Sequence, residues 1–508
     1  MSPLSCWHKL ESFHFYLNKI KELNSQISEE IQNVKKAKLQ NRLDRLVENK
    51  SSVSNEIWNI RRKAIGNADL KLTIKSQEGE KLTEQEDIKA RYLEYFCELL
   101  EPRPPATDYS QHAIEINKLF NINMQITSYD SLEINQPFDM EELEIVIKDL
   151  KRNKCPGPDE IPNEIIKYSG TAMKKSILNM INTFFMKEKI PTELLKLTIK
   201  SVFKGKGDTG DLANHRGLFI GNSILKLYET LKLNGIANDL KFSEYQAGGR
   251  KSHGIADQLF IIYSIIQKAK NDNTALILQF MDLIKAFDKM LLKAVMLDLW
   301  DSEIKGRLWR NIFQINKQAK IKIKTPFGET SEAEIAEILK QGSVLATILA
   351  ALHTDSIKKY FVNSGLGSYY RNLHIPNLLF QDDIVRIEKN SNDMNTANMR
   401  HNTYKEINRM KFHEDKTVIL RVNMKKPEQT EVKLDGKLLK CVKQQKYLGD
   451  IITENGTHEK TIMERENNIT GTTAEISNIL SETAHVIQMK SITQYMKKHH
   501  HSKTNNQH

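Results

Sequence analysis

Apolar residues spaced by threes and fours run through the first 64 residues of the chain. Between residues 14 and 64 the sequence is dense in charge, and its apolar positions would form one stripe along a long helix. The heptad is not strict, so packing of this helix on its own domain is favoured over self-association in a coiled coil, which stays open. The stripe consists of Leu17, Ile20, Leu23, Ile27, Ile31, Val34, Leu39, Leu43 and Leu46.

Further helices are expected at 84–100 and from Met140 to about Arg152, the second capped by Asp139. Between them, the prolines of EPRPPATD (residues 101–108) forbid helix and mark a linker, which predicts a domain boundary near residue 105. The second helix ends in the turn NKCPGPDEIP. From this turn to about residue 270 the pattern is mostly helical, and a polar, helical tail that is expected to end in disorder begins near residue 456.

Patterns typical of strands punctuate the second half of the chain. LTIKSVF (197–203) interrupts the helical region, and TALILQFMD (274–282) is typical of a buried strand that ends on an aspartate. A helical stretch at 283–315 precedes IKIKTPFG (321–328), which alternates like an exposed strand. LLFQDDIVRIEK (378–389) predicts two short strands with a polar turn between them, and KTVILRV and EVKLDGKLLK add further β segments.

Composition adds a basic charge and little sign of disulfides. Among 508 residues, 75 Lys and Arg face 64 Asp and Glu, for a formal net charge of +11. This excess favours a polyanionic partner, although a merely soluble basic protein fits the charge equally well. Cys6, Cys97, Cys155 and Cys441 form no Cys-x-x-Cys pair, so neither a disulfide framework nor a zinc site is indicated.

Targeting signals are not expected in this sequence. The first residues lack the pattern of a signal peptide, and apolar runs such as LFIIYSII (259–266) fall far short of the roughly 20 residues that span a bilayer. We therefore expect an intracellular protein without a membrane segment, in the nucleus or the cytoplasm.

Carboxylates stand at the ends of predicted strands. A strand that ends on Asp282 and a hairpin that presents Asp382 and Asp383 at its turn would bring three carboxylates to one sheet edge. Oxygen clusters of this kind suit Mg²⁺, and paired metals can clamp the attacking and leaving oxygens of a phosphoryl displacement. Taken alone, however, Asp-Asp is an ordinary hairpin-turn pair, and that reading is the more favoured one.

The order of eight short motifs changes this balance. They are NKCPGPDEIPNEIIKY, SVFKGKGDTGDLANHRGLFIGNSILKLYE, EYQAGGRKSHGIADQLF, FMDLIKAFDKM, KQGSVLATIL, LLFQDDIV, HEDKTVIL and KYLGDIIT. Together they closely resemble the reverse transcriptase of non-LTR (LINE-type) retrotransposons, over roughly residues 75–475. The resemblance implies an α+β right-hand polymerase with fingers, an antiparallel palm sheet and a thumb, which adds dNTPs to a primer 3′ hydroxyl on an RNA template. The partners implied are template RNA, a DNA primer or target, and dNTPs.

The resemblance also implies a metal site. Asp282, Asp382 and Asp383 match the aspartates that hold two Mg²⁺ ions in the palm, with Mn²⁺ as a possible substitute. Positioning and neutralisation of charge are what nucleotidyl transfer needs from a protein. We expect Asp282 and Asp382 to be direct ligands of both ions and Asp383 to be a supporting ligand. Asp288, in the same motif, is expected to have a structural role.

Three positions match residues around the nucleotide. Phe287 lies where the family has the aromatic gate that excludes ribonucleotides, although its pattern alone favours a core phenylalanine. Gln341 and Gly342 match the Q-G pair that lines the nucleotide and template pocket, where glycine permits close backbone approach.

Other positions match residues that bind phosphates and the primer. Arg216 matches the fingers arginine that contacts the triphosphate, with Lys204 or Lys206 assisting it. Lys416 matches a palm lysine near the leaving pyrophosphate, and an exposed lysine without a role is an equal alternative. Tyr447 to Gly449 match the hairpin that grips the primer end.

One glycine-rich segment resembles a motif of a different class of protein. Gly205–Gly210 satisfies the glycine pattern of a dinucleotide-binding turn, but no helix is expected to open there, so a fingers loop is favoured.

Several positions depart from the family pattern. Gln381 replaces the small residue usual before the aspartates, and LAT at 345–347 replaces Leu-Ser-Pro. Further departures are Gly235 for arginine, Leu194 for tryptophan and His413 for asparagine. A ligand misplaced by an ångström costs about a hundredfold in rate, so an inactive copy that only binds nucleic acid is the alternative.

We therefore expect four regions. These are helix and linker at 1–105, pre-fingers and helical fingers at 106–270, palm and primer-grip hairpin at 271–455, and a short thumb with a polar tail at 456–508. Neither the endonuclease domain that such elements carry nor a Cys/His knuckle is expected in this sequence.

Overall fold

The computed structural model describes residues 74–100 and 111–467, apart from positions 238, 338, 341, 362, 371–372, 409, 424–429, 458 and 465. The chain divides into two compact units, and the larger one is Lys71–Thr461. Four expectations lie outside the described residues: the helix at 14–64, the linker at 101–108, Gln341 and the end of the tail. The role of Asp288 and the four expected domain boundaries stay predictions.

The helices begin and end close to where the apolar spacing predicts. The helix expected from Met140 starts there, because the Asp139 carboxylate accepts a hydrogen bond of 2.8 Å from the backbone N–H of Glu142, whose own carboxylate accepts one of 2.8 Å from Asp139. The helices are α3 (Gln85–Leu100), α4 (Gln111–Gln125), α5 (Met140–Asp149), α6 (Asn163–Lys167), α7 (Thr171–Lys187), α8 (Ser223–Ile236), α9 (Ile255–Asn271), α10 (Ala286–Lys289), α11 (Leu292–Asp301), α12 (Arg307–Lys317), α13 (Val344–Asp355) and α14 (Ser391–Ile407).

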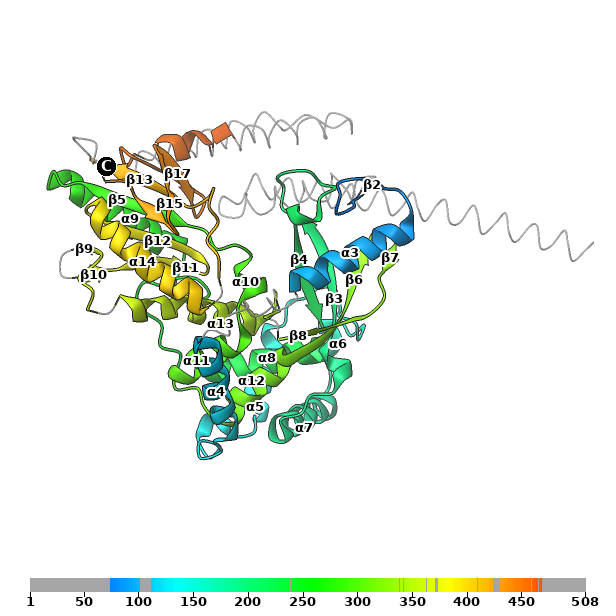
Figure 1. Ribbon diagram of the computed structural model, residues 1–508. Coiled ribbons are helices and arrows are strands. Elements are labelled where there is room, and N and C mark those ends of the chain that lie inside the picture. Colours follow the sequence, from blue (N-terminus) through cyan, green and yellow to red (C-terminus); the bar gives the residue numbers. More distant parts are fainter. Residues whose placement is uncertain are drawn as a thin grey trace, which may run out of the picture. The chain divides into compact units, whose positions relative to one another are not determined.

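The strands form two larger sheets and several hairpins (Figure 1). We call β11-β12-β5-β13-β16 the central sheet and β4-β3-β6-β7, with β8 also paired to β6, the lysine-rich sheet. The strands are β1 (Ile74–Lys75), β2 (Lys81–Leu82), β3 (Lys196–Phe203), β4 (His215–Gly221), β5 (Leu276–Met281), β6 (Gln318–Thr325), β7 (Gly328–Glu329), β8 (Ala333–Ala336), β9 (Ser368–Tyr370), β10 (Leu373–Ile375), β11 (Asn377–Phe380), β12 (Asp383–Glu388), β13 (Val418–Val422), β14 (Lys433–Leu434), β15 (Lys437–Leu438), β16 (Lys440–Val442), β17 (Gln444–Tyr447) and β18 (Asp450–Thr453).

The central sheet lies between α9 and α14 (Figure 1). Every residue of β5 is buried, as expected for an unbroken apolar strand. Its alternate residues pack on opposite sides, Leu278 in the cluster with α9 and Ile277 in the cluster with α14. The pairings from β11 to β13 are antiparallel, whereas β16 joins β13 in parallel. The expectation of an antiparallel sheet is therefore confirmed for its first four strands and wrong at its β16 edge.

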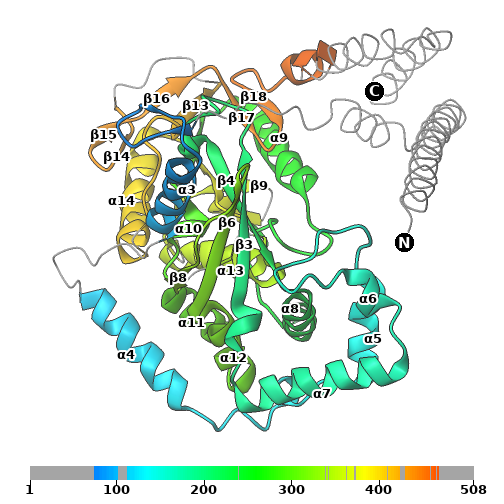
Figure 2. The ribbon, with the colours of Figure 1, turned by 90° about the vertical axis from the view of Figure 1, so that its right-hand side faces the viewer.

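The lysine-rich sheet corrects two expectations. The segment 215–221, expected within a mostly helical region, is strand β4, because it pairs with all but the first residue of β3. The segment 321–328 was expected to alternate like an exposed strand. The alternation is confirmed, with one face exposed, but β6 has strands on both sides and pairs in parallel with β3. Ile199, Ile321 and Ile323 on one face of this sheet lie in one buried cluster with residues of α3. Figures 1 and 2 show α3 beside this sheet. Such long-range pairings leave no trace in a local sequence window.

The opposite face of the lysine-rich sheet carries exposed basic residues. Arg216 on β4 pairs with Val202 on β3, and Lys200 on β3 pairs with Lys324 on β6, so their side chains share a face. Lys322 on the same face is also exposed. The strict alternation of β6 thus separates an isoleucine face in the core from a lysine face in solvent.

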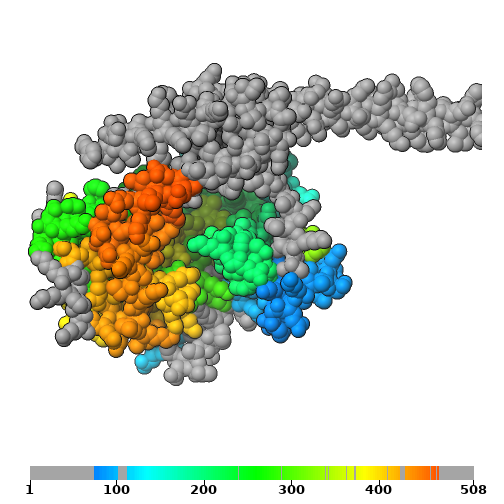
Figure 3. Space-filling view, turned by 90° about the horizontal axis from the view of Figure 1, so that it is seen from above, coloured from blue at the N-terminus to red at the C-terminus, as the bar shows by residue number. Residues whose placement is uncertain are grey.

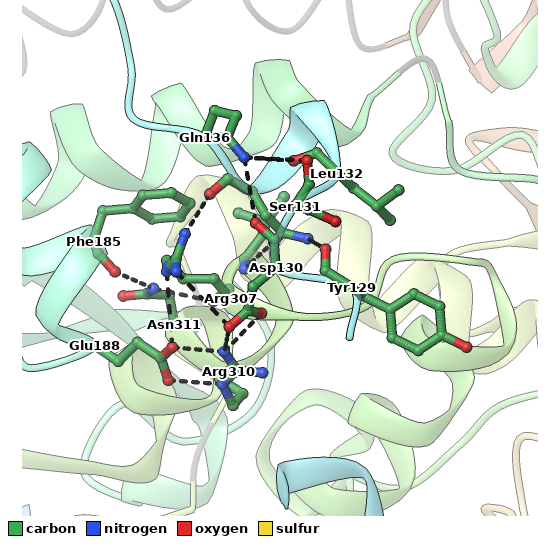
Figure 4. Close-up of polar contacts among 12 residues, drawn as sticks. Tyr129, Asp130, Ser131, Leu132, Gln136, Phe185, Glu188, Arg307, Arg310 and Asn311 are labelled. Carbon is green, nitrogen blue, oxygen red and sulfur yellow. Dashed lines mark hydrogen bonds and ion pairs between the residues drawn. The ribbon is translucent and has the colours of Figure 1, made fainter. Parts of the chain in front are cut away.

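A buried arginine ties the helices below this sheet together (Figure 4). Arg310 on α12 is 5% exposed and donates to both carboxylate oxygens of Asp130 at 2.8 and 2.7 Å, and to both of Glu188 at 2.8 and 2.7 Å. It also donates to the carbonyl oxygen of Ile126 at 2.9 Å. The Arg310 guanidinium therefore joins two segments that are separate in the sequence, one at Asp130 and one at Glu188.

Replacement of Arg310 tests this tie. Arg310→Met would leave the carboxylates of Asp130 and Glu188 with only their longer ion pairs to Arg307, at 3.8 and 4.0 Å, and we expect a loss of about 2–4 kcal/mol in the free energy of unfolding. Lys174→Ala, which breaks the more exposed pair with Glu144 at 3.4 Å, should cost about 1 kcal/mol or less. Denaturant unfolding of both variants measures the difference, and equal losses would contradict a special role for Arg310.

Candidate active site

The register of the central sheet brings the three expected aspartates to one end. Ile384 on β12 pairs with Met281 on β5, so the next positions, Asp383 and Asp282, stand opposite each other where the strands end. Phe380 pairs with Asp383, which leaves Gln381 and Asp382 as a two-residue turn. The predicted strand, turn and strand of LLFQDDIVRIEK are therefore confirmed.

The three carboxylates influence one another electrostatically. Burial raises the pKa of Asp383 to about 6, with further contributions from the negative charges of Asp382 and Asp282. The pKa of Asp382 is also raised, chiefly by burial and then by Asp282, while Arg216 acts in the opposite direction. Negative charge is thus concentrated at the end of this sheet.

Lys416 is the cation in contact with this cluster. Its Nζ lies 3.0 Å from Oδ2 of Asp282, and its side chain is 62% exposed. The segment that carries it is held in place because the backbone N–H of His413 donates to the carbonyl oxygen of Asp282 at 2.8 Å. The ammonium group therefore has a defined place beside one of the aspartates.

The donor chemistry of the cluster fits a hard cation, but its geometry is not assembled. Carboxylate oxygens are the ligands that Mg²⁺ prefers, and mutual repulsion is what a bound cation relieves. Among the described residues, however, no three His, Cys, Asp or Glu side chains are placed so that they could hold a metal ion. Coordination of one ion by all three aspartates would therefore require a different placement of their side chains.

Arg216 and the lysines near it lie on and after β3 and β4. Arg216 is exposed on β4 and lies close enough to Asp382 to affect its pKa. The Nζ of Lys204 donates to the carbonyl oxygen of Ala213 at 2.8 Å, whereas Lys206 is exposed in the loop between the two strands. Only the short 3-10 turn Leu212–Asn214 precedes β4, so the expected absence of a phosphate-binding helix after Gly210 is confirmed.

Figure 3 shows this loop, in green, and the segment of β13 to β18, in orange, on either side of a hollow. Both the lysine-rich sheet and the central sheet belong to the larger compact unit, Lys71–Thr461.

Phe287 and Gly342 contact other parts of the protein, and the structure does not test the contacts with nucleotide and template that the resemblance implies. Phe287 on α10 is half-buried and packs against the main core, in line with the alternative of a core phenylalanine. Gly342 has φ +102°, and a Cβ there would lie 3.2 Å from Cδ1 of Leu218 and 3.3 Å from the carbonyl oxygen of Phe219. The glycine thus permits a close approach to strand β4. Its expected approach to a ligand stays a prediction.

A cavity of about 230 Å³ lies beside Gly342, between β4 and the start of α8. Two buried charged residues line it: Glu229, which accepts a hydrogen bond of 2.9 Å from Ser343, and Lys340, which donates one of 2.6 Å to the carbonyl oxygen of Ile315. Burial lowers the pKa of Lys340 to about 8, against the opposing charge of Glu229. Buried hydrogen bonds of Glu229 and Lys340 therefore help to hold the turn at Gly342.

Tyr447 and Gly449 lie in a hairpin, as expected. Leu448 and Gly449 have φ of 49° and 85° and form the turn between β17 and β18. Tyr447 is only 5% exposed, and its ring lies 5.6 Å from that of Phe280 in the central sheet. Burial, and then the charge of Asp383, raise its pKa. The hairpin thus packs beside the aspartates, whereas contact with a primer stays a prediction.

One residue of this site has no precedent in the sequence reasoning. Gln246, in a loop before α9, is fully buried and accepts a hydrogen bond of 3.2 Å from the backbone N–H of Gln381 in the aspartate turn. Gln246 lies within one of the eight motifs, but a glutamine between Tyr245 and Ala247 gives no sequence signal of such a contact.

The raised pKa of Asp383 predicts a pH-dependent stability. Its value of about 6 lies above the ordinary 3.8, so ionisation destabilises the folded chain progressively between these values and fully above them. In metal-free protein, Asp383→Asn should therefore be more stable than the wild type at pH 7.5 by about 2–3 kcal/mol, and equally stable near pH 4.

Urea unfolding with a chelator present at both pH values measures this effect. Asp301→Asn, which changes an aspartate that is 59% exposed, is the matched control and should show no such gain. A wild type and an Asp383→Asn variant of equal stability at pH 7.5 would contradict the electrostatic description of the site.

No helix in the described part of the chain has the length and apolar character to cross a membrane. Residues 205–452, just under half of the chain, match the family model described as reverse transcriptase (RNA-dependent DNA polymerase). The match extends from the loop after β3 into β18, so it includes Arg216, Lys416 and the three aspartates. The expectation of an RNA-directed DNA polymerase is confirmed for this segment, whereas the non-LTR type and the two Mg²⁺ ions stay predictions.

Proposed function

We propose, from the premise that residues 205–452 form a reverse transcriptase domain, that this chain extends a primer 3′ hydroxyl with dNTPs on an RNA template, in the manner of non-LTR retrotransposons. The observation that carries the proposal is the strand register that sets Asp383 opposite Asp282 with Asp382 in the adjoining turn. The order of the motifs supports the non-LTR type.

The aspartates are the proposed metal ligands. Two Mg²⁺ ions bound by Asp282 and Asp382, with Asp383 as a supporting ligand, would neutralise charge that develops on the α-phosphate and the pyrophosphate. The raised pKa values of Asp382 and Asp383 support this role, because a bound cation would offset the cost of burying neighbouring carboxylates. Lys416 would exchange its contact with Asp282 for the leaving phosphates.

The basic face of the lysine-rich sheet is the proposed contact for nucleic acid. Arg216 shares this face with Lys200, Lys322 and Lys324 and also lies near Asp382. A planar guanidinium there suits the triphosphate of the incoming nucleotide, and the lysines suit the phosphates of the template RNA. Binding should therefore weaken as salt rises.

A second candidate is a copy that binds nucleic acid without catalysis. The specific observation in its favour is that no three carboxylates among the described residues are placed to hold a metal ion. This candidate keeps the salt-sensitive binding and lacks nucleotide addition, so one assay separates the two.

Primer extension on an RNA template with dNTPs and Mg²⁺ is that assay. We expect extension by the wild type and a loss of at least about a hundredfold in rate for Asp382→Ala, because the variant lacks a charge that must be positioned in the transition state. Asp301→Ala, at the exposed end of α11, should extend normally. An Asp382→Ala rate equal to the wild-type rate would refute the site, and binding without extension by the wild type would favour the second candidate.

Phe287 is tested by its discrimination between sugars. Phe287→Val should raise the incorporation of ribonucleotides relative to deoxyribonucleotides about tenfold or more, if the ring excludes the 2′ hydroxyl. Because the ring also packs against the core, thermal unfolding of the variant must be followed in parallel. A loss of stability with unchanged sugar discrimination would leave Phe287 as a core residue only.

A further inference from the structure

The aspartate turn is bound from one side by a loop of the same unit. We call Ser243–Arg250, with the sequence SEYQAGGR, the cradle loop. The backbone N–H of Leu379 donates to the carbonyl oxygen of Tyr245 at 3.0 Å, and the N–H of Ala247 donates to the carbonyl oxygen of Leu379 at 3.0 Å. Gln246 and Leu379 thus form a parallel bridge, and the cradle loop lies along the outer edge of β11.

The Gln246 side chain closes this contact over the turn. Its Oε1 accepts hydrogen bonds from the N–H of Gln381 at 3.2 Å and the N–H of Gly248 at 2.9 Å, and its Nε2 donates to the carbonyl oxygen of Ala351 at 3.2 Å. Gln381 has φ 58°, a left-handed conformation that few residues adopt without support. A fully buried carboxamide therefore holds the strained residue that immediately precedes Asp382.

Two glycines of the cradle loop shape a notch for Gln381. A Cβ on Gly248 would lie 2.2 Å from the backbone nitrogen of Gln381, and a Cβ on Gly249 would lie 2.6 Å from its Nε2. With its amide oriented to satisfy both neighbours, Gln381 accepts from the N–H of Gly249 at 2.8 Å and donates to the carbonyl oxygen of Thr347 at 3.3 Å. Two of the departures from the family pattern, Gln381 and Thr347, are thus in contact.

The cradle loop is itself fixed at both ends. The carboxylate of Asp355 accepts from the backbone N–H of Ser243 at 2.9 Å and also from its hydroxyl group. Arg250 donates to the carbonyl oxygens of Ser243 and Gln246 at 2.9 and 2.8 Å. A loop anchored in this way can transmit a fixed position to the turn it holds.

We infer that Gln246 is a positioning residue of the active site, which fixes Asp382 through the Gln381 turn, and that Gln381 is accommodated by the glycine notch. The inference rests on the proposed function, since it concerns the placement of the proposed metal ligands. It also changes the interpretation of Gln381 as a damaging substitution. Gly248 and Gly249 leave space for its larger side chain, and the carbonyl oxygen of Thr347 accepts a hydrogen bond from it.

Gln246→Met tests the inference, because methionine keeps the shape of glutamine and removes the acceptor. We expect kcat for primer extension to fall about tenfold to a hundredfold while KM for dNTP changes little, as for a misplaced catalytic group. Hydrogen exchange of the peptide that contains residues 378–388 should become faster. Gln258→Met is the matched control, because Gln258 is equally buried and donates to Tyr245 at 2.8 Å without reaching the turn.

Gly248→Ala is a second, steric test. Its Cβ would meet backbone atoms of the turn, so the turn itself must move, and we expect the same loss in kcat with faster exchange of 378–388. Gly254→Ala, in the same segment but with no atom within 4 Å of its Cβ, should leave both unchanged.

The two readouts separate the inference from the proposed function. If the wild type does not extend primers, the proposed function fails, and hydrogen exchange alone decides whether Gln246 holds the turn. Exchange that is equally slow in the wild type and Gln246→Met would overturn the inference. A Gln258→Met variant that loses as much kcat as Gln246→Met would overturn it too, because the effect would then be general loosening of the loop.

Discussion

The burial of carboxylates beside one another at the end of one sheet is the constraint on which the site depends. Strand pairing brings Asp282, Asp382 and Asp383 to this end, and burial, followed by the charges of neighbouring aspartates, raises the pKa values of Asp382 and Asp383. A site of this kind must be held by the rest of the molecule, because it does not stabilise itself. The burial of β5 on both faces supplies that support, since neither face of the strand can shift without disturbing a packed core.

The supports are divided between local and distant segments. The β5–β12 register sets which residues face each other. Lys416, which lies in the segment before β13, offsets part of the negative charge of Asp282. The cradle loop reaches the turn from the segment before α9, and its anchor, Asp355, lies at the end of α13. The aspartates are contributed by two strands, but their placement depends on segments spread over much of the described chain.

The sequence predicted what depends on local pattern. The capped start of α5, the buried strand β5 and the strand, turn and strand around Asp382 were expected, because caps and alternation act over a few residues. Strand β4 was missed, since Gly217, Arg216 and His215 hide a strand whose stability comes from pairing with β3. The contact of Gln246 with Gln381 was missed for the same reason, as it joins residues 135 positions apart. The order of the motifs identified the aspartates because it reflects which distant segments pair in the fold, and a local pattern contains no such information.

The glycine notch makes the residues allowed at positions 249 and 381 depend on each other. The Gln381 amide occupies the space that a side chain on residue 249 would need, so the residues at 249 and 381 cannot both be large without repacking. A larger residue at 249 would require the flexible end of Gln381 to move aside, and its backbone, with φ +73°, would be strained as well. The residue at 381 therefore cannot be judged as damage without the residue at 249.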